Sequence, residues 1–232
     1  MWGIWWRSDE RELSTTEDTG DRRTKPYDFC SVSAVSPVVE MFVSAHRYEL
    51  SRALISTPLG EMLALASETG LCALEFMGQR QGGARRAVPR LARLDHRLRR
   101  WFPPHQIVDR DVPVIARTRE WLAAYFNGAT PDGAGELPLD MRGAGFETRV
   151  WTILRTIPAG ETRSYGTIAR ALGTPGASRA VGMANGANPI AIIVPCHRVI
   201  GSSGSLTGYG GGLERKKWLL DHERRWRGSV LF

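Results

Sequence analysis

The stretch that decides the fold of this chain runs Ile190-Ala191-Ile192-Ile193-Val194-Pro195-Cys196-His197-Arg198. Its first five residues are apolar and mostly β-branched, which predicts a buried strand. Pro195 cannot donate a hydrogen bond to a neighbouring strand, so the strand is predicted to end there. A thiol therefore stands at the predicted strand end, with an imidazole beside it.

Cys196 is the candidate nucleophile. A thiol with a pKa of about 8.5 is only slightly ionised at neutral pH, and the thiolate is the reactive form, so an imidazole within reach would change its chemistry. Neighbouring residues of an extended strand point to opposite faces, so a turn must intervene before Cys196 and His197 can meet. Such a pair alone is more often structural, because cysteine is among the most buried residue types.

The residues around this pair follow a longer pattern. In chain order its parts are Ser164-Tyr165-Gly166, Arg179-Ala180-Val181-Gly182, Asn188-Pro189-Ile190, Pro195 to Ile200, Thr207-Gly208-Tyr209 and Lys217 to Glu223. This string, from about Leu137 to Glu223, resembles the O6-alkylguanine-DNA alkyltransferase family, also called methylated-DNA-protein-cysteine methyltransferases. A weaker resemblance extends back to about Ser56.

The resemblance implies a role for each matching residue. Cys196 would take the alkyl group from the guanine oxygen and keep it as a thioether, so each molecule would react once. His197 would remove the thiol proton through a water, and Glu223 would orient that imidazole. Asn188 would join the helix pair to the active-site strand. Tyr165 would help to rotate the nucleotide and would stabilise the departing guanine.

The resemblance also implies how the substrate, O6-alkylguanine in double-stranded DNA, would be bound. A recognition helix would lie in the minor groove, with Arg179 filling the stack that the extruded base leaves. Its close approach would depend on small residues, namely Ala177, Ser178, Ala180, Gly182 and Ala184. Backbone groups around Val199, Tyr209 and Gly210 would form the wall of the guanine site. O4-alkylthymine stays open as a second substrate, as does the size of the alkyl group.

No cofactor and no metal are implied. Transfer of an alkyl group to a thiolate needs an activated sulfur, a positioned base and a proton for the leaving oxygen. The three cysteines, Cys30, Cys72 and Cys196, are widely spaced and fit neither a disulfide framework nor a zinc site. A reducing compartment suits a nucleophilic thiol.

The charge of the chain is uneven. The 232 residues carry a net charge of +7, and 42% of them are hydrophobic, which suffices for an ordinary core. From Met141 to Phe232 there are 13 Lys and Arg against 5 Asp and Glu, so the excess lies in the C-terminal part. A positive domain suits DNA, because phosphate contacts release counterions, although a solubilising surface explains the charge equally well.

We expect a cytoplasmic, monomeric protein with no membrane attachment. No apolar run approaches the ~18 residues that a membrane span needs, and the N-terminus lacks the apolar region of a signal peptide.

Three regions are predicted, in an α/β (α+β) fold. Residues 1–45 are mostly polar and predict a disordered extension, whose role stays open, as does whether Met41 is the true start. Residues 46–135 predict a small antiparallel sheet with helices, a ribonuclease-like domain. Residues 136–232 predict a mainly helical DNA-binding alkyltransferase domain. Small residues, Gly and Pro at 129–136 mark the boundary.

In the N-terminal part, turn signals around Gly60 and Gly70 separate short apolar runs that predict strands. Cys72, Leu74 and Phe76 alternate with period two, so they are predicted to share one buried face. Cys72 is accordingly interpreted as a core residue.

Apolar residues at helical spacing predict the helices. One helix with a basic outer face ends at Trp101, another stops near Asn127, and a third is ended by Pro158. Ser164 is predicted to cap a fourth helix. A four-residue turn with two glycines joins it to a fifth, at about 177–186, which makes a helix-turn-helix.

Three other functions stay open at this point. A lesion sensor of the alkyltransferase-like kind would keep the helix pair but lack the cysteine. A plain helix-turn-helix regulator would give Cys196 and His197 no role, and a cysteine hydrolase would leave the basic domain without one. A DNA-binding helix pair followed closely by a cysteine favours a reaction on DNA, for which the nucleotide must be extruded from the duplex.

Overall fold

The computed structural model describes residues 47–78, 87–129 and 137–229, all within one unit that begins at Ser44. The predicted extension, residues 1–45, lies outside the described residues, as does almost all of the predicted linker at 129–136. The domain boundary at 135/136 therefore stays a prediction.

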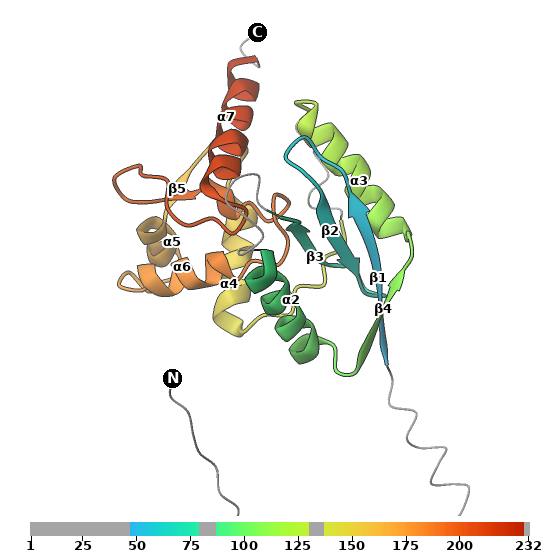
Figure 1. Ribbon diagram of the computed structural model, residues 1–232. Helices are drawn as coiled ribbons and strands as arrows, with labels where there is room; N and C mark the ends of the chain where they lie inside the picture. The colour runs from blue at the N-terminus through green and yellow to red at the C-terminus, as the bar shows by residue number, and fades with distance from the viewer. Residues whose placement is uncertain (1–46, 79–86, 130–136, 230–232) are drawn as a thin grey trace, which may run out of the picture. The chain divides into compact units, whose positions relative to one another are not determined.

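A four-stranded sheet forms the N-terminal half (Figure 1), in the order β3 (Leu71–Phe76), β2 (Met62–Ala66), β1 (Tyr48–Ile55) and β4 (His105–Asp109). The first three strands along the chain pair antiparallel, as predicted. Strand β4 pairs in parallel with β1, so the sheet is mixed. Strand β4 was not predicted, because it is an edge strand that is largely exposed and has no apolar alternation.

Cys72 is fully buried, as predicted, but on the other face of the sheet. The register between β2 and β3 shifts after Leu65, and Cys72 is the additional residue. It packs in a small cluster with leucines of helix α2 (Ala87–Trp101), whereas Leu74 and Phe76 belong to the main core. The prediction of a shared face was wrong because this bulge breaks the alternation. Burial raises the pKa of the Cys72 thiol to about 12.

Helices cover both faces of the sheet. Helix α2 packs on the face that holds the small cluster, and helix α3 (Pro113–Phe126) packs on the face of the main core. Figure 1 shows the two helices on opposite sides of the sheet. Both end where the sequence predicted. No helix within the described residues is long and apolar enough to cross a membrane.

The C-terminal half is mainly helical, as predicted. Its helices are α4 (Gly145–Arg155), α5 (Tyr165–Ala171), α6 (Ser178–Gly186) and α7 (Leu213–Ser229). The predicted cap of α5 is present, because the Ser164 hydroxyl accepts a hydrogen bond from the Thr167 amide at 3.1 Å. Helices α5 and α6 pack together across a tight turn, and this confirms the helix-turn-helix.

The segment Ile190–Val194 is a buried turn, so the prediction of a strand was wrong. Ile192 has φ +70°, which no strand residue adopts. The Asn188 side chain stabilises the turn: Nδ2 donates to the Val194 carbonyl at 2.8 Å, and Oδ1 accepts from the Ile190 amide at 3.0 Å. The apolar run reflects complete burial, which periodicity cannot distinguish from strand pairing.

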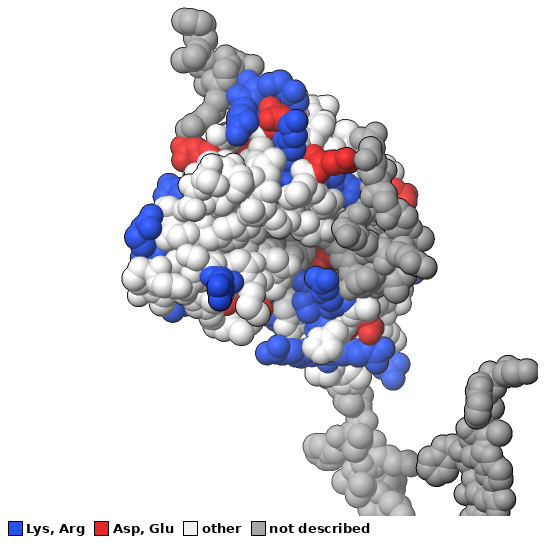
Figure 2. All heavy atoms as spheres, turned by 60° about the vertical axis from the view of Figure 1, so that its left-hand side comes forward, with Lys and Arg blue, Asp and Glu red and all other residues white. Residues whose placement is uncertain are grey.

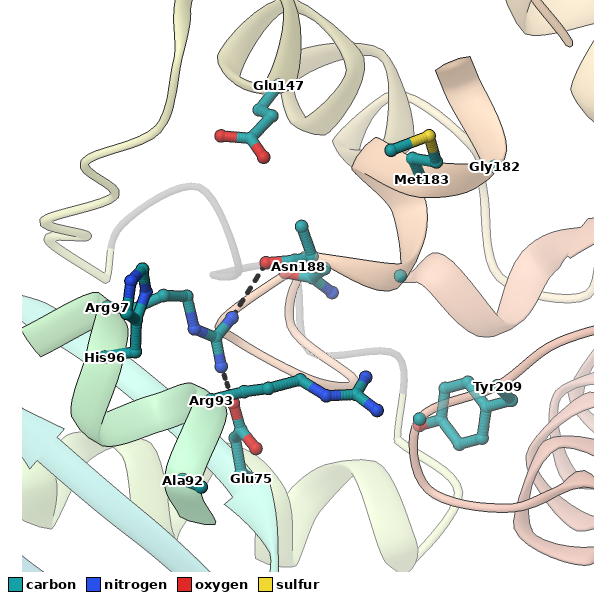
Figure 3. Close-up of a pocket in the computed structure, with 13 residues that line it drawn as sticks. Glu75, Ala92, Arg93, His96, Arg97, Glu147, Gly182, Met183, Asn188 and Tyr209 are labelled. Atoms are coloured by element: carbon teal, nitrogen blue, oxygen red, sulfur yellow. Dashed lines mark hydrogen bonds and ion pairs between the residues drawn. The ribbon is translucent and has the colours of Figure 1, made fainter. Parts of the chain in front are cut away.

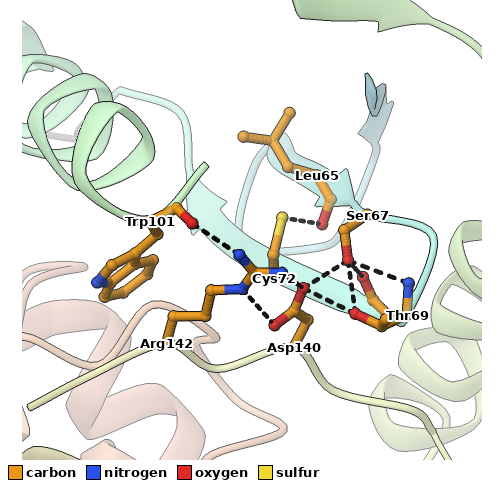
Figure 4. A network of polar contacts seen from close by, with 8 residues as sticks. Leu65, Ser67, Thr69, Cys72, Trp101, Asp140 and Arg142 are labelled. Atoms are coloured by element: carbon orange, nitrogen blue, oxygen red, sulfur yellow. Dashed lines mark hydrogen bonds and ion pairs between the residues drawn. The ribbon is translucent and has the colours of Figure 1, made fainter. Parts of the chain in front are cut away.

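A polar network fixes the start of the C-terminal half on the sheet (Figure 4). Asp140 Oδ2 accepts hydrogen bonds from Ser67 Oγ at 2.7 Å and from Thr69 Oγ1 at 2.8 Å. Arg142 Nε donates to Asp140 Oδ1 at 3.0 Å, and its Nη1 donates to the Trp101 carbonyl at 2.7 Å. Asp140 thereby joins the β2–β3 turn to the segment that leads into α4.

Replacing Asp140 with alanine should lower the free energy of unfolding by about 2 kcal/mol, since partly buried donors would lose a charged acceptor. Urea denaturation measures the change. Asp111→Ala is the matched control, because its ion pair with Arg119 is exposed at both ends and should contribute less than about 0.5 kcal/mol. Equal losses in the two variants would contradict this role for Asp140.

Candidate active site

Cys196 opens a 3₁₀ turn, Cys196–Arg198, directly after the buried turn. Only 7% of it is exposed, and it is not disulfide-bonded. Its amide donates to the Val194 carbonyl at 2.8 Å, and Asn185 Nδ2 donates to its carbonyl at 3.4 Å. Hydrogen bonds therefore hold both the amide and the carbonyl of Cys196. The chain also turns at Cys196, as the sequence requires if Cys196 and His197 are to meet.

His197 is completely buried in the same turn. Its Nε2 lies 2.8 Å from Glu223 Oε1, and a carboxylate can only accept, so Nε2 carries the proton. Its Nδ1 is buried and has no hydrogen-bond partner among the described residues. Burial lowers the pKa of His197, although the charge of Glu223 opposes this. The imidazole is thus neutral at neutral pH, with Nδ1 available to take up a proton.

Glu223 of α7 is the centre of this network and is completely buried. Its carboxylate accepts hydrogen bonds from His197, from the amide of Gly160 at 3.0 Å and from the hydroxyl of Tyr125 at 2.8 Å. Arg198 donates to it twice, at 2.8 and 2.9 Å. Burial alone would raise the pKa of Glu223, but His197 and Arg198 hold it well below its usual range. The carboxylate is therefore ionised.

Acid should destabilise the protein through this pair. The folded state keeps His197 neutral and Glu223 ionised at pH values where the unfolded chain binds protons, so stability falls as pH falls. The loss should begin near about pH 6.5, where an unfolded histidine titrates, and grow below about pH 4.5 through Glu223. Melting temperatures at about pH 7.5, 6 and 5 test this.

His197→Gln should remove the part of this loss near pH 6.5, whereas His96→Gln, at an exposed position on α2, should leave it in place. A melting temperature that stays constant on acidification, or an equal effect of the two substitutions, would contradict the assignment.

Lys216 is a buried cation that the sequence analysis missed. It has no exposed surface, and its Nζ donates to the carbonyls of Val199 at 2.5 Å and Thr207 at 2.6 Å. Burial lowers its pKa to about 8, while the charge of Cys196 opposes this shift, so the two groups influence each other electrostatically. A signal was available, because Lys216 and Glu223 are seven residues apart on the same helix face as Leu219.

Three further residues of the network were also missed. Tyr125 was interpreted as part of an apolar helix face, although a buried tyrosine hydroxyl normally has a partner. Arg198 and Asn185 were visible in the sequence but had no assigned role. Their contacts join positions that are far apart along the chain, and neither spacing nor periodicity predicts such contacts.

Tyr165 lies close to the loop that follows the active-site turn. Strand β5 (Arg163–Ser164) pairs in parallel with β6 (Val199–Ile200), which places the start of α5 beside this loop. The Tyr165 hydroxyl donates to the Thr207 carbonyl at 3.5 Å. The helix-turn-helix therefore contacts the loop at 201–212 directly through this hydrogen bond, and the β5–β6 pairing holds the two beside each other.

The predicted guanine wall lies next to His197. Val199 is fully buried, and the ring centroids of Tyr209 and His197 lie 6.4 Å apart in an edge-on arrangement. Tyr209 and Gly210 line one end of a groove of about 1080 Å³, which Figure 3 shows between helices α2 and α6. Asn188 lines the same groove. The structure thus brings together Cys196 and most of its predicted partners.

The predicted DNA-binding residues lie on α6, except Tyr165, which begins α5. Arg179 and Ala180 are exposed, and Ser178 and Gly182 are half-buried. Figure 2 shows the side of the molecule that carries α5 and α6, where Lys and Arg are more frequent than Asp and Glu. No cluster of His, Cys, Asp and Glu that could hold a metal ion occurs in the described ranges.

The fold thus places a helix-turn-helix, which is a DNA-binding motif, beside a buried cysteine, histidine and glutamate. Residues 145–225 match the model of the 6-O-methylguanine DNA methyltransferase DNA-binding domain. The methylated-DNA-protein-cysteine methyltransferase of Mycolicibacterium paratuberculosis is 64% identical over 106 residues, which cover 46% of this chain and 63% of the relative. The match thus spans less than two thirds of this curated relative.

Two solved structures are similar over more of the chain. The crystal structure of Mycobacterium tuberculosis OGT in complex with DNA has 40% identity and a TM-score of 0.59, covering 77% of this chain and 94% of that chain. The O6-methylguanine-DNA methyltransferase of the archaeon Pyrococcus kodakaraensis has 25% identity and a TM-score of 0.56, covering 75% and 98%. The chain therefore belongs to the O6-methylguanine-DNA methyltransferase family, which confirms the resemblance seen in its sequence.

Proposed function

We propose that this protein repairs double-stranded DNA by transferring the alkyl group of O6-alkylguanine irreversibly to Cys196. The observation that carries the proposal is the buried arrangement of Cys196, His197 and Glu223 directly beside a helix-turn-helix. The relatives support it, because curated members are methylated-DNA-protein-cysteine methyltransferases and one was crystallised with DNA.

The reaction begins with activation of the thiol. The Cys196 proton moves through a water to Nδ1 of His197. The Nε2 proton of His197 remains on Nε2, hydrogen-bonded to Glu223. The ionised carboxylate stabilises the imidazolium that forms. Lys216 adds positive charge near the thiolate.

Transfer is a single displacement. The Cys196 sulfur forms a bond to the alkyl carbon as the bond from that carbon to guanine O6 breaks, and its electron pair leaves with guanine. The Tyr165 hydroxyl stabilises the departing guanine anion. This anion takes up a proton from water while His197 returns the Cys196 proton to water, so that protons and charge balance. The product is a neutral thioether, in which Cys196 keeps the alkyl group and no longer has a thiolate to react with. Each molecule therefore reacts once.

DNA binds along α6, where small residues permit close approach to the backbone. The target nucleotide leaves the duplex at a cost of a few kcal/mol, and Arg179 fills the gap in the stack. Its exposure on the first turn of α6 is consistent with this role. Val199, Tyr209 and Gly210 hold the extruded guanine, and O4-alkylthymine is a second candidate for the same site.

Asn188 acts through the turn that it stabilises, since this turn delivers Cys196. In this proposal residues 136–232 bind DNA and carry the reaction, and residues 46–135 support the site through Tyr125. The protein acts as a monomer in the cytoplasm, where a reducing environment preserves the thiol.

The experiment is a titration of duplex DNA containing one O6-methylguanine, with an unmodified duplex as control. Repair should stop at one lesion per protein molecule. Continued turnover would indicate a hydrolase. Tight, lesion-specific binding without repair would indicate a sensor, and binding without lesion preference would indicate a regulator.

A further inference from the structure

Arg215 is a buried arginine in the first turn of α7, with 5% of its surface exposed. Its guanidinium donates to three backbone carbonyls: Nε to Leu59 at 2.9 Å, and Nη1 to Gly78 at 2.9 Å and to Gly211 at 3.1 Å. The guanidinium carbon also lies 4.5 Å from the centre of the Phe76 ring. An arginine is suited to these contacts, because its donors lie in one plane that also stacks on an aromatic ring.

These contacts join two parts of the molecule. Phe76 ends strand β3, and Leu59 and Gly78 lie in loops next to the sheet, whereas Gly211 directly follows the predicted guanine wall. Packing at this junction is tight: a Cβ on Gly211 would lie 2.5 Å from the Tyr209 ring and 3.1 Å from the Phe76 ring. The segment next to the wall therefore packs against the end of β3, and the Arg215 side chain contacts both.

The next residue, Lys216, fixes the other end of the same loop through the carbonyls of Val199 and Thr207. Two neighbouring buried cations on α7 thus hold the loop at both ends. Lys216 lies near the thiol, whereas Arg215 contacts the part of the loop that carries Tyr209 and Gly210.

We infer that Arg215 is a positioning residue that sets the Tyr209–Gly210 part of the predicted guanine wall against the sheet and thereby determines how well an alkylguanine base is held. This inference rests on the proposed function, because the wall binds guanine only if that function is right. The hydrogen bonds of Arg215 to Leu59, Gly78 and Gly211 lie outside the Cys196, His197 and Glu223 arrangement, so its loss should weaken base binding without altering thiol chemistry.

The test compares Arg215→Met and Arg215→Lys with Lys217→Met, a control that removes an exposed cation two positions further along α7. Hydrogen-deuterium exchange of the 201–212 peptide reports on the loop without any substrate. Transfer from the free base O6-benzylguanine, whose benzylic carbon is displaced readily, gives a half-saturation concentration and a limiting rate. Alkylation of Cys196 by iodoacetamide as a function of pH reports on the thiol alone.

Arg215→Met should speed exchange in this peptide and raise the half-saturation concentration about tenfold, with the limiting rate changed less than about twofold. Arg215→Lys should fall between this variant and the wild type, and Lys217→Met should match the wild type. The pH profile of iodoacetamide alkylation should stay the same in all three.

Unchanged exchange and unchanged half-saturation in Arg215→Met would overturn the inference. So would a parallel loss of iodoacetamide reactivity, since that would show a general effect on the fold. A wild-type protein that takes no alkyl group from either DNA or the free base would overturn the proposed function instead, and the exchange result would still decide whether Arg215 holds the loop.

Discussion

Glu223→Gln should slow alkyl transfer to Cys196 by a factor of about 10² or more, since it removes the group that orients the base and stabilises its charged form. It should also lower the free energy of unfolding by about 3–5 kcal/mol, because the nearly buried Arg198 would lose its counter-charge. The amide of glutamine carries two N–H donors, and these would face the donors of Tyr125, Arg198 and His197.

Single-turnover kinetics and urea denaturation measure the two effects. Asp221→Asn is the matched control, since it removes an acidic charge from the same helix at a site whose pair with Arg224 is exposed. That variant should stay within about 0.5 kcal/mol of the wild type and react at the same rate. If Glu223→Gln reacted as fast as the control, the orienting role of Glu223 would be refuted.

Cys196→Ala should abolish alkyl transfer completely while leaving DNA binding intact. No other described thiol can replace it, because burial raises the pKa of Cys72 to about 12 and keeps that sulfur within the core. The substitution removes one sulfur atom from a turn whose hydrogen bonds do not involve the Cys196 side chain but join backbone groups to Asn185 and Asn188, so the fold and the surface of α6 should persist.

Gel-shift titration and alkyl transfer measured on the same samples test this separation. Cys72→Ala serves as the control and should retain transfer, with some loss of stability from the cavity in the small core cluster. Residual transfer in Cys196→Ala would show that another nucleophile accepts the alkyl group.

Local signals in the sequence were enough to predict much of the fold. The Ser164 hydroxyl caps α5 because a serine before a helix accepts a backbone hydrogen bond, and this interaction involves only residues that are close in the sequence. The turn with Ile192 at positive φ was unpredictable from its apolar residues, because it depends on hydrogen bonds from Asn188 that replace strand pairing. Strand β4 escaped prediction because an exposed edge carries no apolar pattern.

The candidate site likewise has residues that could be predicted from the sequence and contacts that could not. Cys196, His197 and Glu223 were identified because they match a family pattern in order. Their supporting contacts were not identified, since Tyr125 reaches Glu223 across 98 positions of the chain. Such contacts exist only once the sheet half and the helical half have packed together, and for this reason the N-terminal half contributes a hydrogen bond to Glu223 without a recognisable motif.

The most direct test of the central claim is the mass of the protein after reaction with a duplex that contains O6-methylguanine, followed by peptide mapping. We expect the peptide bearing Cys196 to gain a single methyl group, in step with loss of the methyl group from the DNA. An unmodified Cys196, or a methyl group on any other residue while the DNA is repaired, would contradict it.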